Sequence, residues 1–242
     1  MDNHFDRHQS IVLQFSGGKD SLACLYLLRE YWDRIVVLWV NTGAAFPETV
    51  AQMEAIRKLV PHFVEVKSDQ PANVAAEGQP SDLISWWDTR LGRSFHSGRS
   101  FKVQSPFQCC LANIWEPLDN ATRALGATLI IRGQRGEDHR KGPMRDGMVH
   151  DGIEFWFPIE KWSGEQVRGF LTSQGVALPP NYAFVDSSLD CWSCTAYLDE
   201  NEGKFRYMKD RHPELHGRAV AELDKLIAAA QSELDNFAKA MR

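Results

Sequence analysis

Apolar runs alternate with amphipathic segments along the first part of the chain, and this alternation predicts a parallel sheet. Short apolar runs at 11–15, 35–40 and 63–66 are separated by segments with helical spacing of apolar residues, at 20–32 and 47–59. Continuous apolar runs of this length are typical of buried strands. Strands that alternate with helices over short connections form βαβ units. The pattern therefore predicts an α/β fold, a parallel twisted sheet flanked by helices.

The alternation of strand and helix patterns stops over residues 70–106, which are rich in Gly, Ser, Pro and Arg. We interpret this stretch as an insertion with one short helix, either a lid or a variable surface loop. The alternation then resumes up to 185, and we predict a first domain over 1–185. Residues 186–242 are predicted to form a second part with a CxxC segment and a C-terminal helical extension. The further elements predicted are helices at 110–125, 163–174 and 213–241 and strands at 128–131 and 155–159.

Composition and charge narrow the class of protein. The 242 residues are 43% hydrophobic and 24% charged, as in ordinary globular proteins, and the net charge of −5 disfavours a globally basic nucleic-acid binder. No uncharged apolar run approaches the ~20 residues of a membrane span. The polar start, Met1–Gln9, does not resemble a signal peptide, and five cysteines are an odd number. These features predict a cytoplasmic protein without a membrane partner.

A glycine-rich hexapeptide follows the first predicted strand and precedes the first predicted helix. Its residues are Ser16, Gly17, Gly18, Lys19, Asp20 and Ser21. Backbone N–H groups and the positive end of a helix make this position an anion site, and glycine lets phosphate oxygens approach the backbone. Lys19 adds a point charge and the serines add hydroxyl donors. The alternative is an ordinary helix-capping turn.

The SGGKDS sequence resembles the signature of the PP-loop family of ATP pyrophosphatases, whose fold is HUP-like. The resemblance implies that the loop holds the phosphates of ATP, that Mg²⁺ assists, and that ATP is cleaved to AMP and pyrophosphate. A second segment, from Asn41 to Thr49, is similar to the TG-x-x-FPET segment of the phosphoadenosine-phosphosulfate (PAPS) reductase branch. By this resemblance Asn41, Thr42 and Gly43 contact the adenosine. By itself the segment also fits a turn before a proline-started helix.

A basic loop follows the strand at 128–131. Arg132, Arg135, His139 and Arg140 are its candidate anion ligands, with Gly133 between them. Such a cluster at the edge of a sheet could clamp phosphate, sulfate or a nucleic-acid backbone. The resembled family has a comparable G-x-R loop, which implies a catalytic role for Lys19, Arg132 and Arg135. The alternative is a solvated loop whose charge Glu137 and Asp138 partly cancel.

Four of the cysteines form a spaced quartet, Cys109-Cys110 and Cys191-x-x-Cys194. Four thiolates suit iron–sulfur or zinc, and adjacent cysteines are awkward for tetrahedral zinc. The pattern is similar to the CC…CxxC set of iron–sulfur adenylylsulfate (APS) reductases, which implies a [4Fe–4S] cluster. A zinc site and unligated thiols remain alternatives. Cys24, on the first predicted helix, is interpreted as a core residue.

The chain also departs from those reductases. They usually lack the loop lysine and carry a nucleophilic cysteine in a mobile tail, whereas this sequence keeps Lys19 and has no cysteine after Cys194. A basic residue commonly follows their CC pair by four positions, and here that residue is Ile114. The first hypothesis is therefore an ATP-cleaving enzyme that transfers sulfur with a [4Fe–4S] cluster.

Two further hypotheses stay open. One is a sulfonucleotide reductase that uses an external thiol. The other is a non-catalytic nucleotide or nucleic-acid sensor with a structural cluster or zinc. The expected partners are an adenine nucleotide, a sulfur-donor protein, a nucleic-acid acceptor and a second copy of the chain in a homodimer.

Overall fold

The computed structural model describes residues 2–95, 101–138, 142–200 and 202–242. Its contacts divide into two compact units. Unit 1 comprises Met1–Asn41, Phe46–Lys67 and Pro117–Tyr182, and unit 2 comprises Thr42–Ala45, Ser68–Glu116 and Ala183–Arg242. The domain boundary predicted at residue 185 stays a prediction. Within the described residues, no helix combines the length and apolarity that crossing a membrane requires.

Unit 1 contains a six-stranded sheet in the order β3-β2-β1-β6-β8-β7. All neighbouring strands run parallel except β7, which is antiparallel to β8 at the edge. The central strands β1 and β6 are buried because both faces of the sheet are covered. The predicted parallel α/β fold is confirmed. The strands are β1 (Ile11–Gln14), β2 (Ile35–Asn41), β3 (Phe63–Lys67), β6 (Leu129–Ile131), β7 (Val149–His150) and β8 (Ile153–Trp156).

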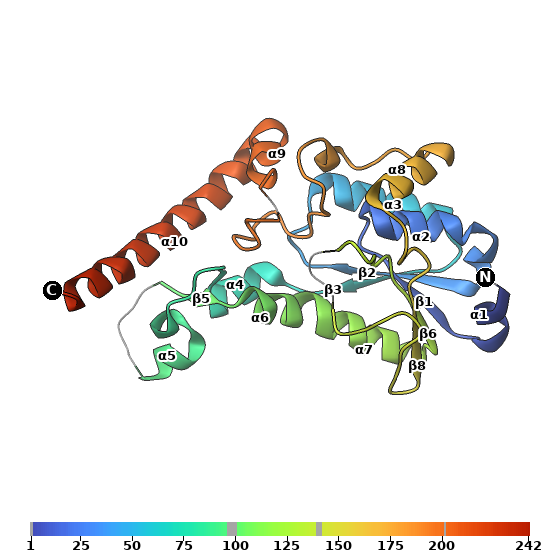
Figure 1. Ribbon diagram of the computed structural model, residues 1–242, viewed down its shortest axis with the longest axis horizontal. Helices are drawn as coiled ribbons and strands as arrows, with labels where there is room; N and C mark the ends of the chain where they lie inside the picture. Colours follow the sequence, from blue (N-terminus) through green and yellow to red (C-terminus); the bar gives the residue numbers. More distant parts are fainter. Residues whose placement is uncertain (1, 96–100, 139–141, 201) are drawn as a thin grey trace. The chain divides into compact units, whose positions relative to one another are not determined.

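Helices cover both faces of this sheet (Figure 1). On one face lie α2, α3 and α8, and on the other lies α7, whose Leu118 and Ala121 pack against a core cluster that includes Val12 and Leu38. A 3₁₀ turn, η1 (Arg29–Arg34), leads into β2 and ends the helix predicted over 20–32 earlier than expected. The helices are α1 (Asp2–Arg7), α2 (Lys19–Leu27), α3 (Pro47–Leu59), α7 (Glu116–Ala124), α8 (Gly164–Ser173) and the 3₁₀ turn η4 (Pro180–Ala183).

Unit 2 holds more regular structure between 70 and 106 than the single short helix predicted there. Asp69 caps α4 by accepting a hydrogen bond from the Ala72 amide, and β4 pairs with β5. After α6 the backbone forms a π-helical turn, η3, before continuing into α7. The elements are α4 (Gln70–Glu77), β4 (Gln79–Pro80), η2 (Trp86–Asp88), α5 (Arg90–Phe95), β5 (Val103–Gln104), α6 (Pro106–Cys110), η3 (Leu111–Trp115), α9 (Lys204–Arg211) and α10 (Pro213–Ala240).

Two elements of unit 1 were not expected from the sequence. Helix α1 forms in the polar N-terminal segment because Phe5 is buried, with its ring stacked 3.8 Å from that of Tyr31. The β7–β8 hairpin turns through Asp151 and Gly152, both with positive φ. An Asp-Gly pair is the common signal for such a turn, so this hairpin had a local signature.

Polar side chains tie the edge strand β3 to its neighbours. Glu65 accepts a hydrogen bond from Asn41 Nδ2 at 2.8 Å and another from Arg57 Nη2 at 2.7 Å. The Asn41 hydrogen bond lowers the pKa of Glu65; burial acts against this, and Arg57 adds to the lowering. The charged carboxylate therefore stabilises the folded edge of the sheet.

Glu65→Gln should destabilise the protein in a pH-dependent way. A lowered pKa stabilises the folded state above the ordinary carboxyl value of 4.5 and is lost as the pH falls through the folded pKa. The loss should be below about 1 kcal/mol, because the group lies near the surface. Urea midpoints should differ between wild type and variant from pH 7 to 5.5 and converge below pH 4.5. A difference that is constant with pH would contradict this account, and Glu54→Gln is the exposed control.

Candidate functional site

The Ser16–Ser21 loop connects the carboxyl end of β1 to the start of α2. Gly17 has a φ of +81°, which favours glycine, and the side chains of Gln52 and Met53 lie over it. The hydroxyl of Ser21 donates to the Gly18 carbonyl at 3.0 Å and lies 3.2 Å from the hydroxyl of Ser16. The predicted strand–loop–helix context is therefore present, and the loop is tightly organised by its own side chains.

Lys19 lies inside unit 1 with only 2% of its surface exposed. Its Nζ is 3.0 Å from Asp20 Oδ2 and 5.6 Å from the centroid of the Tyr182 ring. The backbone N–H of Lys19 donates to the Tyr182 hydroxyl at 2.8 Å. A phosphate that used the Lys19 ammonium would therefore have to share it with Asp20.

Arg135 is buried against the same aspartate. Its guanidinium lies 2.7 Å from Asp20, 2.9 Å from Glu137 and 3.3 Å from Asp138. Burial alone lowers the pKa of Arg135, but the three carboxylates raise it overall. Three carboxylates thus surround the side chains of Lys19 and Arg135. The positive charge of these two residues is therefore balanced, and this part of unit 1 is not strongly cationic.

Arg132 and Arg135 have different partners, although both were predicted to face one anion. Arg132 Nε donates to Gln14 Oε1 at 2.5 Å, and its guanidinium lies 5.3 Å from the Phe155 ring centroid. Burial lowers the pKa of Arg132. Gly133 between them packs closely on α2, because a Cβ there would lie 2.6 Å from the Asp20 carbonyl carbon. The predicted residues His139 and Arg140 lie outside the described residues.

The predicted adenosine segment is divided between the two units. Asn41, in unit 1, donates to Glu65 as described above. In unit 2, Thr42 is buried and its hydroxyl lies 3.2 Å from the sulfur of Cys191. Gly43 is exposed with a φ of +75°, so its backbone turns sharply without a side chain. The adenosine role of these three residues stays a prediction.

All four cysteines of the quartet line one cavity in unit 2. The cavity has a volume of about 60 Å³, several times the ~15 Å³ that holds one water molecule. Cys109 and Cys110 come from the end of α6, and Cys191 and Cys194 come from the loop before α9. The remaining lining residues include Gln70, Asn113, Ile114, Tyr197 and Lys204. Cys24 lies in unit 1, fully buried as predicted for a core residue.

Burial raises the pKa of three of these thiols, those of Cys109, Cys110 and Cys191. Burial raises the pKa of Cys109 to about 11 and that of Cys110 to about 12, and Cys194 adds to both shifts. Burial also raises the pKa of Cys191, against a contribution from Thr42. Metal binding would therefore have to displace protons from the thiols.

Lys204, the first residue of α9, holds the CxxC turn. It is 2% exposed, and its Nζ donates to the carbonyl oxygens of Cys191 at 2.9 Å and Cys194 at 2.6 Å. The Cys194 amide also donates to the Cys191 carbonyl at 3.3 Å. Burial lowers the pKa of Lys204, and negative charge on the two neighbouring thiols would act against this lowering.

The residues around the cavity fit an iron–sulfur group. Gln70 Nε2 is buried and makes no hydrogen bond of ordinary geometry among the described residues, so a sulfur acceptor would satisfy it. Sulfurs around one zinc stand ~3.8 Å apart, because a tetrahedral Zn–S bond is about 2.3 Å. Within the described ranges, no three cysteine sulfurs lie within 4.8 Å of one another. A cluster of several irons takes a wider set of sulfurs than a single zinc ion.

Sequence reasoning missed several residues of these sites. Lys204 and Gln70 were missed because an isolated lysine or glutamine carries no motif. Tyr197 was also missed: its hydroxyl lies 3.6 Å from the sulfur of Cys110. Tyr182, which holds the Lys19 amide, carried no signal either.

A comparison with models of known protein families gives a match over most of this chain. The model of the phosphoadenosine phosphosulfate reductase domain matches residues 10–197. This chain belongs to that family. The predicted membership of the PP-loop, PAPS reductase-like group is confirmed.

Curated members of the PAPS reductase domain family are distant relatives. The chain is 27% identical over 172 residues to the phosphoadenosine 5'-phosphosulfate reductase of Photorhabdus laumondii, covering 70% of this chain and 64% of the relative. It is 21% identical over 197 residues to the adenosine 5'-phosphosulfate reductase of Deinococcus radiodurans, covering 81% and 70%. The chain thus spans slightly under two thirds of the first of these relatives.

A solved structure of the same family shares the fold. The crystal structure of phosphoadenylyl-sulfate reductase from Candida auris, in a phosphate complex, superposes with a TM-score of 0.54 at 16% identity. The match covers 77% of this chain and 83% of that chain. The likeness supports the parallel α/β architecture of the family.

Lys204→Met should loosen the CxxC turn. The variant keeps the length of the side chain but removes the Lys204 donor from the Cys194 carbonyl and leaves the Cys191 carbonyl with the Cys194 amide, which costs about 1–3 kcal/mol. We expect a lower thermal midpoint and faster reaction of Cys191 and Cys194 with a thiol reagent. Lys209→Met, on an exposed position of the same helix, is the matched control. Equal thiol reactivity in both variants would contradict the positioning role.

Proposed function

We propose that the chain binds an adenine nucleotide and carries out sulfur chemistry at a four-cysteine iron–sulfur centre. The observation that carries the proposal is the single cavity lined by Cys109, Cys110, Cys191 and Cys194. The cavity belongs to a chain of the PAPS reductase domain family, which ties it to sulfonucleotide chemistry.

The first candidate reaction is reduction of a sulfonucleotide, the activity named in the relatives from both organisms. The bond between sulfur and the phosphate oxygen breaks, and sulfur(VI) gains two electrons to leave as sulfite. An external dithiol supplies the electrons, becomes a disulfide and releases two protons. The nucleotide product is the adenosine phosphate that remains.

In this proposal different residues bind the phosphate, contact the adenosine and position the loop. Ser16 to Ser21 bind the phosphate side of the nucleotide through backbone amides and hydroxyls, and Asn41 to Gly43 contact the adenosine. Arg135 holds Asp20 and thereby the start of α2, since its guanidinium contacts that carboxylate at 2.7 Å. Arg132 remains the candidate for the substrate anion.

The quartet would hold a [4Fe–4S] cluster, which would supply an electron-rich, charged centre when it is bound. The protein's contribution is the donor set and its surroundings. Lys204 fixes the CxxC turn through its two hydrogen bonds, and Gln70 offers an N–H donor. A zinc ion in place of the cluster would leave a structural centre and would favour the sensor hypothesis.

The second candidate is cleavage of ATP to AMP and pyrophosphate. It is favoured by the complete SGGKDS loop with Lys19. Here an acceptor oxygen bonds to the α-phosphorus, pyrophosphate leaves with the help of Mg²⁺, and sulfur from a sulfur-donor protein then displaces AMP. Nucleic acid and small molecules are the acceptor classes. The pairing of Lys19 with Asp20 weakens this candidate, because that carboxylate competes with phosphate.

One pair of assays separates the two candidates. Anaerobically purified protein is given PAPS or APS with dithiothreitol, and in parallel ATP with Mg²⁺ and tRNA, DNA or sulfate. We expect sulfite from the sulfonucleotide and no pyrophosphate from ATP. Pyrophosphate without sulfite would establish the second candidate instead. Nucleotide binding without either product would contradict both and favour the sensor hypothesis.

Lys19→Ala tests the loop. Loss of the buried ammonium should weaken nucleotide binding by roughly 10-fold or more, since a charge-assisted contact contributes about 1.5–3 kcal/mol. Iron content should stay unchanged, because the cysteines lie in the other unit. Isothermal titration with adenosine 3',5'-bisphosphate and with ATP measures the effect, and Lys161→Ala is the exposed control. Unchanged affinity would remove Lys19 from the binding site.

A further inference from the structure

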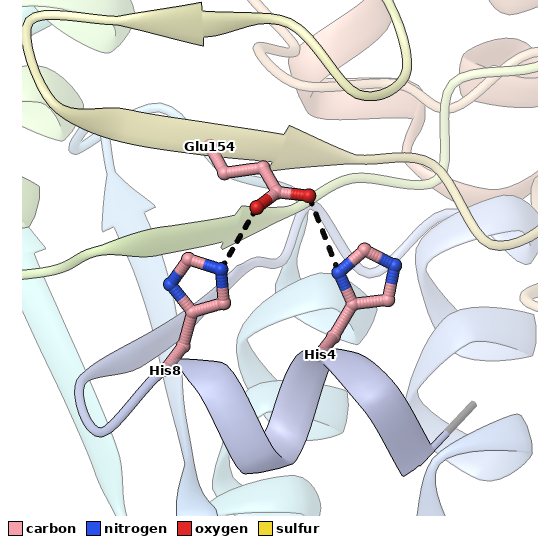
Figure 2. Close-up of side chains that lie close together, drawn as sticks. All are labelled: His4, His8 and Glu154. Atoms are coloured by element: carbon pink, nitrogen blue, oxygen red, sulfur yellow. Dashed lines mark hydrogen bonds and ion pairs between the residues drawn. The ribbon is translucent and has the colours of Figure 1, made fainter.

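Two histidines and a glutamate form a cluster of ligand-type side chains in unit 1, outside the sites described above. His4 Nδ1 lies 3.4 Å from Glu154 Oε1, and His8 Nε2 lies 2.9 Å from Glu154 Oε2. All three ligand atoms lie within 4.8 Å of one another. Figure 2 shows both rings turned toward the one carboxylate.

Local structure brings the two rings together. The backbone N–H of His8 donates to the His4 carbonyl at 3.0 Å, so the helical turn continues one residue beyond α1. Residues four apart on a helix share one face, which places both imidazoles on the same side. Glu154 comes from β8, so the three ligands join the N-terminal helix to a strand of the sheet (Figure 2).

Both rings are held in orientation by groups outside the trio. The Nδ1 of His8 lies 3.1 Å from the Thr128 hydroxyl, which leaves its Nε2 directed at the carboxylate. The His4 ring stacks on Trp156, with centroids 4.4 Å apart and planes at 19°. Metal-binding histidines characteristically have their second nitrogen or ring plane fixed in this way.

The helix that carries the histidines is itself anchored. Phe5 is 3% exposed and stacks on Tyr31, which fixes the middle of α1. Arg34 Nη2 donates to the carbonyls of Phe5 at 3.0 Å and His8 at 3.1 Å, where the helix ends. The ligand atoms are therefore preorganised, which reduces the entropy lost on binding an ion.

One cation already touches the cluster. Arg7 Nη2 lies 3.2 Å from Glu154 Oε1 and 3.2 Å from His4 Nδ1. The Arg7 side chain is 49% exposed, so it can turn toward water when a divalent ion takes over its contacts. The contact shows that the Glu154 carboxylate attracts positive charge. Arg7 therefore competes with any ion that binds there.

We propose that His4 Nδ1, His8 Nε2 and the Glu154 carboxylate bind a divalent transition-metal ion of the zinc type. Two imidazoles and one carboxylate are ligands that Zn²⁺ accepts, with water at the fourth position. The bound ion clamps α1 to β8. Its role is structural: it links the N-terminal segment to strand β8 of the sheet.

The test on the unaltered chain uses ¹⁵N-labelled protein freed of metal by a chelator and titrated with ZnSO₄. Long-range ¹H–¹⁵N spectra of the histidine rings report each nitrogen separately, so zinc on the cysteines does not interfere. We expect His4 Nδ1 and His8 Nε2 to shift, while His62 and His150 stay unchanged. Zinc binding that leaves both ring nitrogens unshifted would overturn the proposal.

Three variants sharpen the result. Glu154→Gln and His8→Gln should each weaken zinc binding at the His4 ring by more than about 10-fold, whereas His150→Gln should not change it. Circular dichroism checks that the variants fold. The thermal midpoint of the wild type should rise with zinc more than that of Glu154→Gln. Equal zinc affinity in all three variants would overturn the proposal.

Discussion

A buried lysine constrains the whole cysteine site. Lys204 has almost no contact with solvent, so its amino group needs acceptors inside the protein, and it donates to the carbonyls of Cys191 and Cys194. This requirement fixes the CxxC turn, and the turn in turn lines the cavity with Cys109 and Cys110. Burial lowers the pKa of Lys204, and negative charge on Cys191 and Cys194 acts against this lowering, so thiolates at the turn would favour the charged form of the lysine.

Charge pairing also governs the loop after β1. Asp20 lies between Lys19 and Arg135, so neither cation is an unopposed anion ligand. Gly133, in the loop after β6, packs closely on the backbone of Asp20 at the start of α2. Arg135 of the same loop pairs with the Asp20 carboxylate, so these two contacts join this loop to α2. A substrate phosphate that uses the Lys19 ammonium or the Arg135 guanidinium has to compete with Asp20.

Much of the fold could be predicted from the sequence because its strands are continuous apolar runs separated by helical periodicity, as at 11–15 and 35–40. The motifs also placed the cysteine quartet together, since four thiols at that spacing carry their own signature. The features that could not be predicted depend on tertiary contacts. Helix α1 depends on one buried residue, Phe5, in a polar segment. Lys204 binds carbonyl groups that are ten or more residues away in the sequence. Arg132 and Arg135 are three residues apart, yet Arg132 contacts Gln14 and Arg135 contacts Asp20.

The most direct test of the central claim is metal analysis of the unaltered protein purified without oxygen. Iron, acid-labile sulfide and zinc are measured per chain, and a Mössbauer spectrum identifies the iron species. The account predicts about four irons and four sulfides per chain with the spectrum of a four-iron cluster. One zinc per chain without sulfide, or four titratable thiols without any metal, would contradict it.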